Sequence, residues 1–278
     1  MPSVSDLPYL IRLLDDNDPD VRPAVREQFA TYDGDISHDL AALGVRLSPA
    51  GKKRVSQWLE PGRRQSLAGA WLVPSNGMAG IADDWDNFEN LLGLLMDFLH
   101  DGITLRPSLH DSLDLLAEDI REQLAEVTAD SLRRYLFVRG PFSRGSKKPD
   151  ALKHFDLCYV IDRGVGNATS LGCLFMLLGR RLNVAIEACN YPGHFLCKMH
   201  DLGRACLVDC AHNGRRFDIE DLLGGSLNIS DKARASIVMP CYLGDVLARY
   251  LLEMHYSLGS LGRSEDADLL KQLAASLK

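Results

Sequence analysis

The sequence predicts a mostly helical α+β protein with a small antiparallel sheet and one deeply buried helix. Apolar side chains recur at helical spacing through most of the 278 residues. Residues 168–182 are apolar on nearly every side, as expected for a helix enclosed by other elements. Three strand-like runs follow that helix, at residues 184–190, 194–199 and 204–210.

The composition is that of an ordinary globular protein. The chain has 31 basic and 38 acidic residues, a net charge of −7, and 46% hydrophobic residues. Because no excess of cations is available to neutralise a phosphate backbone, we expect no nucleic-acid partner. No apolar stretch is long enough to span a bilayer, so we expect no membrane partner either. The first residues lack a signal-peptide pattern, and the seven cysteines form no Cys-x-x-Cys pair, so we expect a cytoplasmic protein with reduced thiols.

Residues 1–60 are predicted to form a helical N-terminal region. Apolar residues recur at helical spacing over 7–14 and again over 21–29, and an Asp-rich turn at 15–20 separates the two stretches. This pair resembles a single HEAT-type repeat, and one copy does not support a solenoid. Glycines and prolines then punctuate short helical pieces as far as residue 85.

Residues 61–150 are predicted to be a helical region packed on the core. Apolar stripes mark helices at 86–100 and 109–124, and a short helix or turn follows at 131–137. A polar loop at 140–149 is the best candidate for a boundary between parts of the chain.

The core is predicted at 151–235 and a helical tail at 236–278. A short helix is expected at 218–223, where two glycines end it. Helices at 242–256 and 265–277 then form the tail. The tail resembles one tetratricopeptide-type helix pair.

The last two strands predict a hairpin that brings His194 and Asp209 together. A four-residue loop at 200–203 places Cys197 opposite Cys206 and His194 opposite Asp209. The Asp209 carboxylate would then accept a hydrogen bond from one imidazole nitrogen of His194 and leave the other nitrogen free to act as a base. In the alternative interpretation, His194 is a turn residue and Asp209 caps a loop.

A nucleophile would be expected at the start of helix 168–182, because the helix dipole and free N–H groups stabilise a thiolate or an oxyanion there. That position holds no cysteine. Ser170 is the first candidate, before Thr169 and Cys173. The apolar surroundings of Cys173 would raise the pKa of its thiol.

These residues resemble the transglutaminase-like superfamily, and most closely its bacterial SirB-type branch, whose members carry helices before the core and a tetratricopeptide-type tail. The resemblance covers residues 156–225 well and 85–278 loosely. It rests on Gly-Asn-Ala-Thr-Ser-Leu at 166–171, Gly-Arg-Arg-Leu-Asn-Val at 179–184, Tyr-Pro-Gly-His-Phe-Leu at 191–196 and Val-Asp at 208–209.

The resemblance implies a papain-like core, in which a central helix packs against an antiparallel sheet. Active members of the superfamily use a Cys, a His and an Asp for acyl transfer or amide hydrolysis. By this match His194 and Asp209 take the His and Asp places. The Cys place falls within 168–170, where this chain has no cysteine, and the SirB-type branch commonly lacks it too.

Three functions remain open at this point. The preferred one is a non-catalytic or regulatory protein that binds a protein or peptide partner. The alternative is a Ser- or Cys-dependent hydrolase or acyltransferase with a His–Asp pair. A metal site ranks lowest, because its donors lack the short spacing of zinc ligands, and we therefore expect neither metal nor other cofactor. The donors in question are Cys189, Cys197, Cys206, Cys210, His200 and His212.

Overall fold

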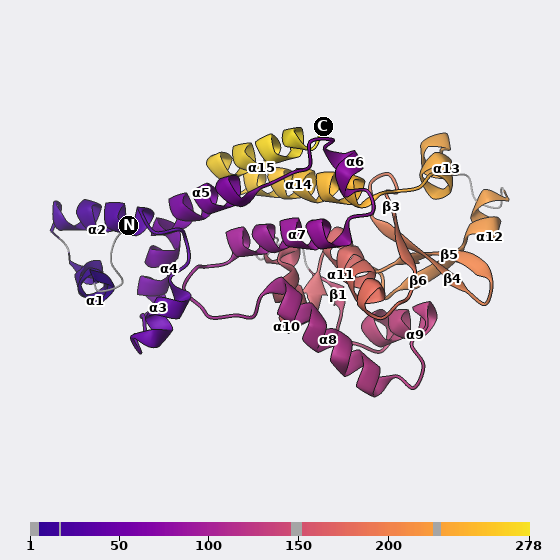
Figure 1. The fold of residues 1–278 in the computed structure, drawn as a ribbon, viewed down its shortest axis with the longest axis horizontal. Coiled ribbons are helices and arrows are strands. Elements are labelled where there is room, and N and C mark those ends of the chain that lie inside the picture. Colours follow the sequence, from indigo (N-terminus) through magenta and orange to yellow (C-terminus); the bar gives the residue numbers. More distant parts are fainter. Residues whose placement is uncertain (1–5, 17, 146–151, 225–228) are drawn as a thin grey trace. The chain divides into compact units, whose positions relative to one another are not determined.

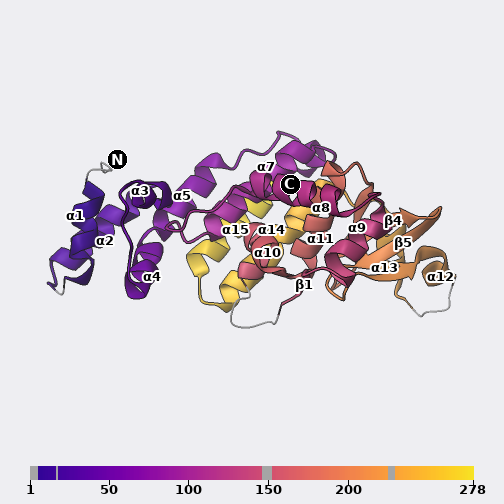
Figure 2. The same ribbon diagram turned by 90° about the horizontal axis from the view of Figure 1, so that it is seen from below.

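The computed structural model describes residues 6–16, 18–145, 152–224 and 229–278. Its fold is α+β and mostly helical, as predicted, and is drawn in Figures 1 and 2. The chain forms two compact units. One consists of residues 1–72 and 97–106, and the other of residues 73–96 and 107–278.

The first unit is a group of helices around its own apolar core. It contains α1 (Leu7–Arg12), η2 (Leu13–Asp15), α2 (Val21–Ala30), α3 (Ser37–Ala42), α4 (Pro49–Trp58) and α5 (Glu60–Ala70). Phe29 and Trp58 lie in this core with ring centroids 5.8 Å apart. The buried guanidinium of Arg63 donates to the carbonyls of Ser56 and Asp101. It thereby ties α5 to the segment 97–106.

The second unit holds the remaining helices. They are α6 (Met78–Ile81), α7 (Trp85–Leu99, of which 97–99 belong to the first unit), α8 (Leu109–Gln123), α9 (Ala129–Arg133), the π-helical η3 (Arg134–Val138), η4 (Lys153–Phe155), α10 (Leu157–Arg163), α11 (Ala168–Arg181), α12 (Ile219–Leu223), α13 (Asp231–Val238), α14 (Leu243–Ser260) and α15 (Ser264–Ser276). In both views α14 and α15 lie side by side (Figures 1 and 2). Across the described residues, none of these helices has the length and apolarity needed to cross a bilayer.

The main sheet has four antiparallel strands in the order β3 (Ile186–Cys189), β4 (Leu196–Asp201), β5 (Arg204–Asp209) and β6 (Arg215–Asp218). β1 (Ser143–Arg144) and β2 (Val165–Gly166) form a separate parallel pair. Helix α11 lies on one side of the main sheet and α12 on the other (Figure 1). Phe195 and Cys197 lie against Gly172 of α11, whereas Leu207 packs with Leu222 and Ile237. A buried helix therefore packs against a small sheet.

The predicted register of the β4–β5 hairpin is wrong by two residues. Cys197 pairs with Val208, and Met199 pairs with Cys206. The turn is Leu202-Gly203 alone, with φ of 49° and 81°, and the strands extend through Asp201 and Arg204. Because side chains alternate with a period of two, a two-residue shift keeps every side chain on its predicted face.

The predicted division at residues 60, 150 and 235 stays a prediction. Its boundary at 150 and the end of the polar loop, from 146 on, lie outside the described residues.

Replacing Leu202 with asparagine should stabilise the protein by about 1 kcal/mol. Leu202 is 98% exposed and occupies the left-handed region, which costs about 1–2 kcal/mol for an ordinary L-residue and less for Asn. Urea denaturation followed by circular dichroism measures the change. An unchanged or lower midpoint in L202N would contradict this assignment of strain to the turn.

Candidate functional site

The candidate site is built around the carboxylate of Asp209, the last residue of β5. His194 reaches it from the turn before β4, where Gly193 has a φ of 74° and the His194 N–H donates to the Tyr191 carbonyl at 3.1 Å. Nε2 of His194 lies 2.9 Å from Oδ1 of Asp209. The predicted imidazole–carboxylate contact is therefore present in the structure.

A second histidine, His212, binds the other oxygen of the same carboxylate. Its Nδ1 lies 2.7 Å from Oδ2 of Asp209, and the two imidazole rings are 5.5 Å apart between centroids. The backbone N–H groups of Ala211 and His212 donate to Oδ1 at 3.1 and 3.2 Å. Two rings and two backbone amides thus hold one carboxylate in place.

Burial and hydrogen bonding act in opposite directions on the pKa of Asp209. Burial raises the pKa, and the hydrogen bonds from His194 and His212 outweigh it, so the pKa lies below its ordinary value. The group is therefore an anion at neutral pH. Because the folded-state pKa is lowered, its contribution to stability is present above the unfolded pKa of about 3.9. That contribution is lost as the pH falls through the folded-state value.

His194 keeps its second ring nitrogen available. The ring uses Nε2 toward Asp209, and among the described residues Nδ1 of His194 makes no hydrogen bond. The side chain is 24% exposed, so solvent reaches it. With the proton on Nε2, Nδ1 is an acceptor and can take a proton from a nearby group.

The hydroxyl of Ser170 belongs to a capping box at the start of α11. The Ser170 N–H donates to the Asn167 side chain at 2.8 Å, and the Asn167 N–H donates to the Ser170 Oγ at 2.9 Å. The hydroxyl also donates to the Asn167 carbonyl at 3.2 Å. Ser170 is fully buried, so its side chain serves the helix end.

The other two candidate nucleophiles are also enclosed. The hydroxyl of Thr169 donates to Glu253 at 2.7 Å. Cys173 is fully buried, and burial first, then the nearby Cys197 and Glu253, raises the pKa of its thiol well above the ordinary value. Among the described residues, neither of these groups nor Ser170 makes a hydrogen bond to His194.

Replacing Ser170 with alanine should lower the free energy of unfolding by about 1 kcal/mol, the usual cost of losing a helix cap. The half-buried Asn167 N–H would lose its closer acceptor and keep only the His154 carbonyl at 3.3 Å. Ser112 in α8 is the matched control, since its hydroxyl only donates to a helical carbonyl and S112A should change stability by no more than about 0.5 kcal/mol. Equal urea midpoints for S170A and S112A would contradict the capping role.

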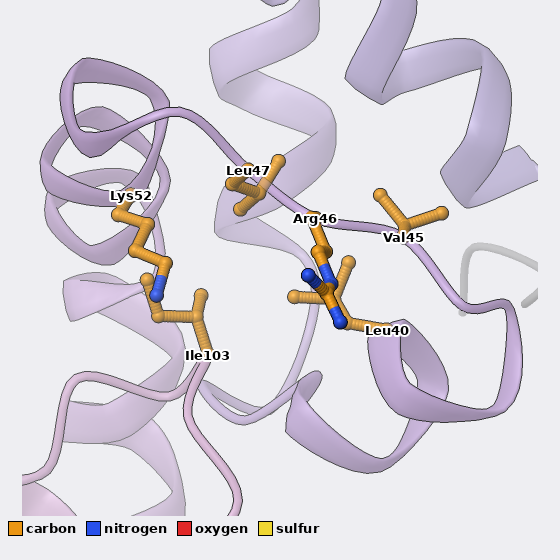
Figure 3. Close-up of a pocket in the computed structure, with 6 residues that line it drawn as sticks. All are labelled: Leu40, Val45, Arg46, Leu47, Lys52 and Ile103. Atoms are coloured by element: carbon orange, nitrogen blue, oxygen red, sulfur yellow. The ribbon is translucent and has the colours of Figure 1, made fainter.

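Two hollows lie away from Asp209. In the first unit a cavity of about 290 Å³ is lined by the residues drawn in Figure 3, where Arg46 and Lys52 bring cationic groups among apolar side chains. In the second unit a larger hollow of about 610 Å³ surrounds the last turn of α11. It is lined by Trp85, Asp86, Glu89, Asn90, His110, Asp114, Arg180, Arg181 and Asn183.

The match to a known protein family covers the elements that build this site. A sequence profile described as the transglutaminase-like superfamily matches residues 107–251, which include α11, the main sheet and the Asp209 site. The chain belongs to the transglutaminase-like superfamily. The resemblance noted from the sequence is thereby confirmed at the level of the superfamily, and the buried helix packed against a sheet agrees with the core expected of it.

Two curated relatives of this transglutaminase-like chain are UPF0162 proteins of Xylella fastidiosa. The protein of strain 9a5c is 27% identical over 176 residues, which cover 59% of this chain and 62% of the relative. The protein of strain Temecula1 is 28% identical over 164 residues, which cover 54% of this chain and 58% of the relative. The chain therefore spans less than two thirds of each relative's length. No solved structure matches the chain.

Sequence reasoning missed the role of His212. It placed His212 only among possible metal donors and did not link it to Asp209. The signal that could have found it is the spacing, since Asp-x-x-His after a strand lets the carboxylate accept the N–H groups of the following turn. That turn delivers the imidazole to the same carboxylate.

Proposed function

We propose that this transglutaminase-like protein is non-catalytic and regulatory, and that it binds a protein or peptide partner. The observation that carries this proposal is the capping box at the start of α11, the place where the resemblance puts a nucleophile. The segment 168–170 offers no thiol, and its one buried serine hydroxyl is bonded within the helix end.

The chemistry of the remaining side chains supports the same proposal. A serine or threonine becomes nucleophilic when a base accepts its proton. Thr169 instead donates to Glu253, which is itself paired with Arg249 at 2.7 Å. Cys173 would need to ionise inside an apolar interior that disfavours the thiolate. His194 and Asp209 then remain as a polar pair that holds the turn before β4 to the end of β5.

The partner surface that we propose is the outer face of the C-terminal helix pair. Leu252 and Tyr256 are one turn apart on α14 and exposed, Tyr256 by 71%. We interpret α14 and α15 as a tetratricopeptide-like tail, and α1 and α2 as a HEAT-like pair, in a SirB-type protein. Exposed apolar side chains on a helix face are the kind of surface against which a partner peptide packs. We also place the protein in the cytoplasm, which its seven free cysteines support.

One observation favours the alternative, an acyl-transfer or amide-hydrolysing enzyme. His194 presents a ring nitrogen with no partner among the described residues while Asp209 orients the ring, which is the arrangement of a general base. In that function the nucleophile would have to reach His194. Ser170 could do so only after leaving its capping box, and Thr169 or Cys173 only after becoming exposed.

Activity-based labelling decides between the two functions. Thiol-directed and serine-directed acylating probes are applied to the full chain and to H194A, and the labelled residue is located by mass spectrometry. We expect no labelling that depends on His194. Labelling of Ser170, Thr169 or Cys173 in the wild type that is lost in H194A would overturn the non-catalytic proposal.

Site-specific crosslinking tests the partner surface. A photo-crosslinking amino acid is placed at position 256 of α14, and at position 271 on the exposed side of α15 as a control. We expect one discrete crosslinked species from position 256 in living cells and none from position 271. The absence of a crosslink at 256, or the same product at both positions, would contradict this surface.

A further inference from the structure

We propose that His194, Asp209 and His212 form a site for a divalent first-row transition-metal ion, with Zn²⁺ as the best-fitting ion. Each residue offers one ligand atom, and these atoms all lie within 4.8 Å of one another. This inference goes beyond the proposed function, because it assigns a ligand to the pair and does not depend on whether the protein has catalytic activity.

The distances suit a small cation. Nε2 of His194 and Nδ1 of His212 lie 2.9 and 2.7 Å from the two oxygens of Asp209. A Zn²⁺ ion about 2.0–2.2 Å from four tetrahedral nitrogen and oxygen ligands spaces those ligands about 3.3–3.6 Å apart. The two hydrogen-bonded pairs lie inside that spacing, and one donor atom from each residue lies within 4.8 Å of the others, so the side chains must rotate to seat the ion.

The donor set selects the class of ion. Two imidazoles and one carboxylate favour zinc and its neighbours in the first transition row, whereas Ca²⁺ and Mg²⁺ prefer oxygen ligands alone. Three protein ligands leave at least one coordination position for water. His212 is 56% exposed, so an ion can enter from solvent and keep that position open.

The carboxylate is prepared for this role before an ion arrives. The N–H groups of Ala211 and His212 hold Oδ1 of Asp209, so the orientation does not depend on the two imidazoles alone. An ion between the three groups needs each imidazole nitrogen that faces Asp209 to present a lone pair, with any ring proton on the other nitrogen.

The cysteines of the metal alternative do not form this site. Among the described residues, the cluster with metal-binding geometry contains no cysteine. Cys189 and Cys197 are buried, and burial raises the pKa of Cys189 to about 11. A thiol that stays protonated at neutral pH is a poor ligand. The structure thus moves the candidate metal site from the strand cysteines to the end of β5.

Titration of the untagged full chain with Zn²⁺ and with Co²⁺ tests the site. After chelator treatment and dialysis, isothermal titration calorimetry gives the Zn²⁺ affinity, and visible d–d absorption reports the Co²⁺ ligands. We expect one ion per chain. H212A should weaken Zn²⁺ binding by at least about 100-fold, because loss of a ligand costs more than the 10- to 100-fold of a supporting residue.

H200A is the matched control, because His200 lies on the neighbouring strand and is exposed; its affinity should equal that of the wild type. Circular dichroism checks that H212A folds. D209N is a second test, because it removes the negative charge of Asp209 and keeps the shape of the side chain. A wild-type Kd for Zn²⁺ weaker than about 1 mM, or equal affinities in H212A and wild type, would overturn the site. A thiolate-to-cobalt charge-transfer band would overturn it as well, since it would place the ion on cysteine.

Discussion

Replacing Arg181 with alanine is expected to lower the free energy of unfolding by about 3 kcal/mol at pH 7, the low end for breaking a buried ion pair. Arg181 is in the last turn of α11, and Glu89 is on α7. Their side chains are 12% and 14% exposed, and two N–H···O contacts of 2.6 and 2.7 Å join them. Without the guanidinium, the largely buried Glu89 carboxylate keeps only the exposed His110 ring, 2.9 Å away, as a side-chain partner among the described residues.

The network around Arg181 explains why one substitution should act on the whole core. Arg181 also donates to Asp114 of α8 at 2.7 Å, and Arg121 of α8 donates to the Arg181 carbonyl at 2.7 Å. These contacts hold the C-terminal end of the buried helix to two neighbouring helices. Arg180, the adjacent residue, is exposed, so R180A should change stability by no more than about 0.5 kcal/mol.

The loss of unfolding free energy caused by R181A should become smaller as the pH falls. Burial raises the pKa of Glu89, but hydrogen bonds from Arg181 and His110 outweigh it and lower the pKa overall. A lowered folded-state pKa gives stability that is present above the unfolded pKa of about 4.3 and lost as the pH falls. The difference between wild type and R181A should therefore narrow from pH 7 to pH 4 in urea denaturation. A difference that is constant with pH, or that R180A reproduces, would contradict this ion pair as the cause.

The sequence alone predicted the helices whose buried residues recur at a regular spacing. The stripes that predict α7, α8 and α14 are apolar residues three and four apart, and most of these residues are buried. Helix α11 was predicted as buried because its apolar residues surround it, and all but its first residue and its last two are buried. These features depend on local pattern alone, which a single chain displays directly.

The sequence was insufficient where a few residues decide the geometry. The hairpin turn puts Leu202 at a positive φ, which leucine gives no reason to expect, so the loop was predicted two residues too long. The strand β6 and the helices α10 and α13 were not predicted, because each has eight residues or fewer and carries a weak period. The capping box of Ser170 and Asn167 was visible as a polar pair three apart, yet the same hydroxyl also fits a nucleophile.

Replacing Gly172 of α11 with alanine should lower the free energy of unfolding by about 2 kcal/mol, in the range of overpacked cores. A Cβ at this position would lie 2.3 and 2.4 Å from ring atoms of Phe195 and 3.4 Å from the Cys197 sulfur. Phe195 is buried, and Arg249 lies 5.5 Å from its ring centroid, so the ring has little room to move. Helix propensity alone would make the alanine variant more stable by about 1 kcal/mol. A net loss of stability would therefore come from the clash of the new Cβ with Phe195.

Gly93 of α7 is the matched control for Gly172, because both are interior helical glycines and a Cβ at Gly93 meets nothing within 4 Å. G93A should therefore gain about 1 kcal/mol, the helix-propensity term by itself. Phe195 precedes β4 and follows His194 directly, so the displacement that G172A forces should also disturb the His194–Asp209 contact. We expect G172A to weaken Zn²⁺ binding, whereas G93A should not change it. If G172A proved as stable as G93A, the close approach of α11 and the sheet at Phe195 could not be what positions His194.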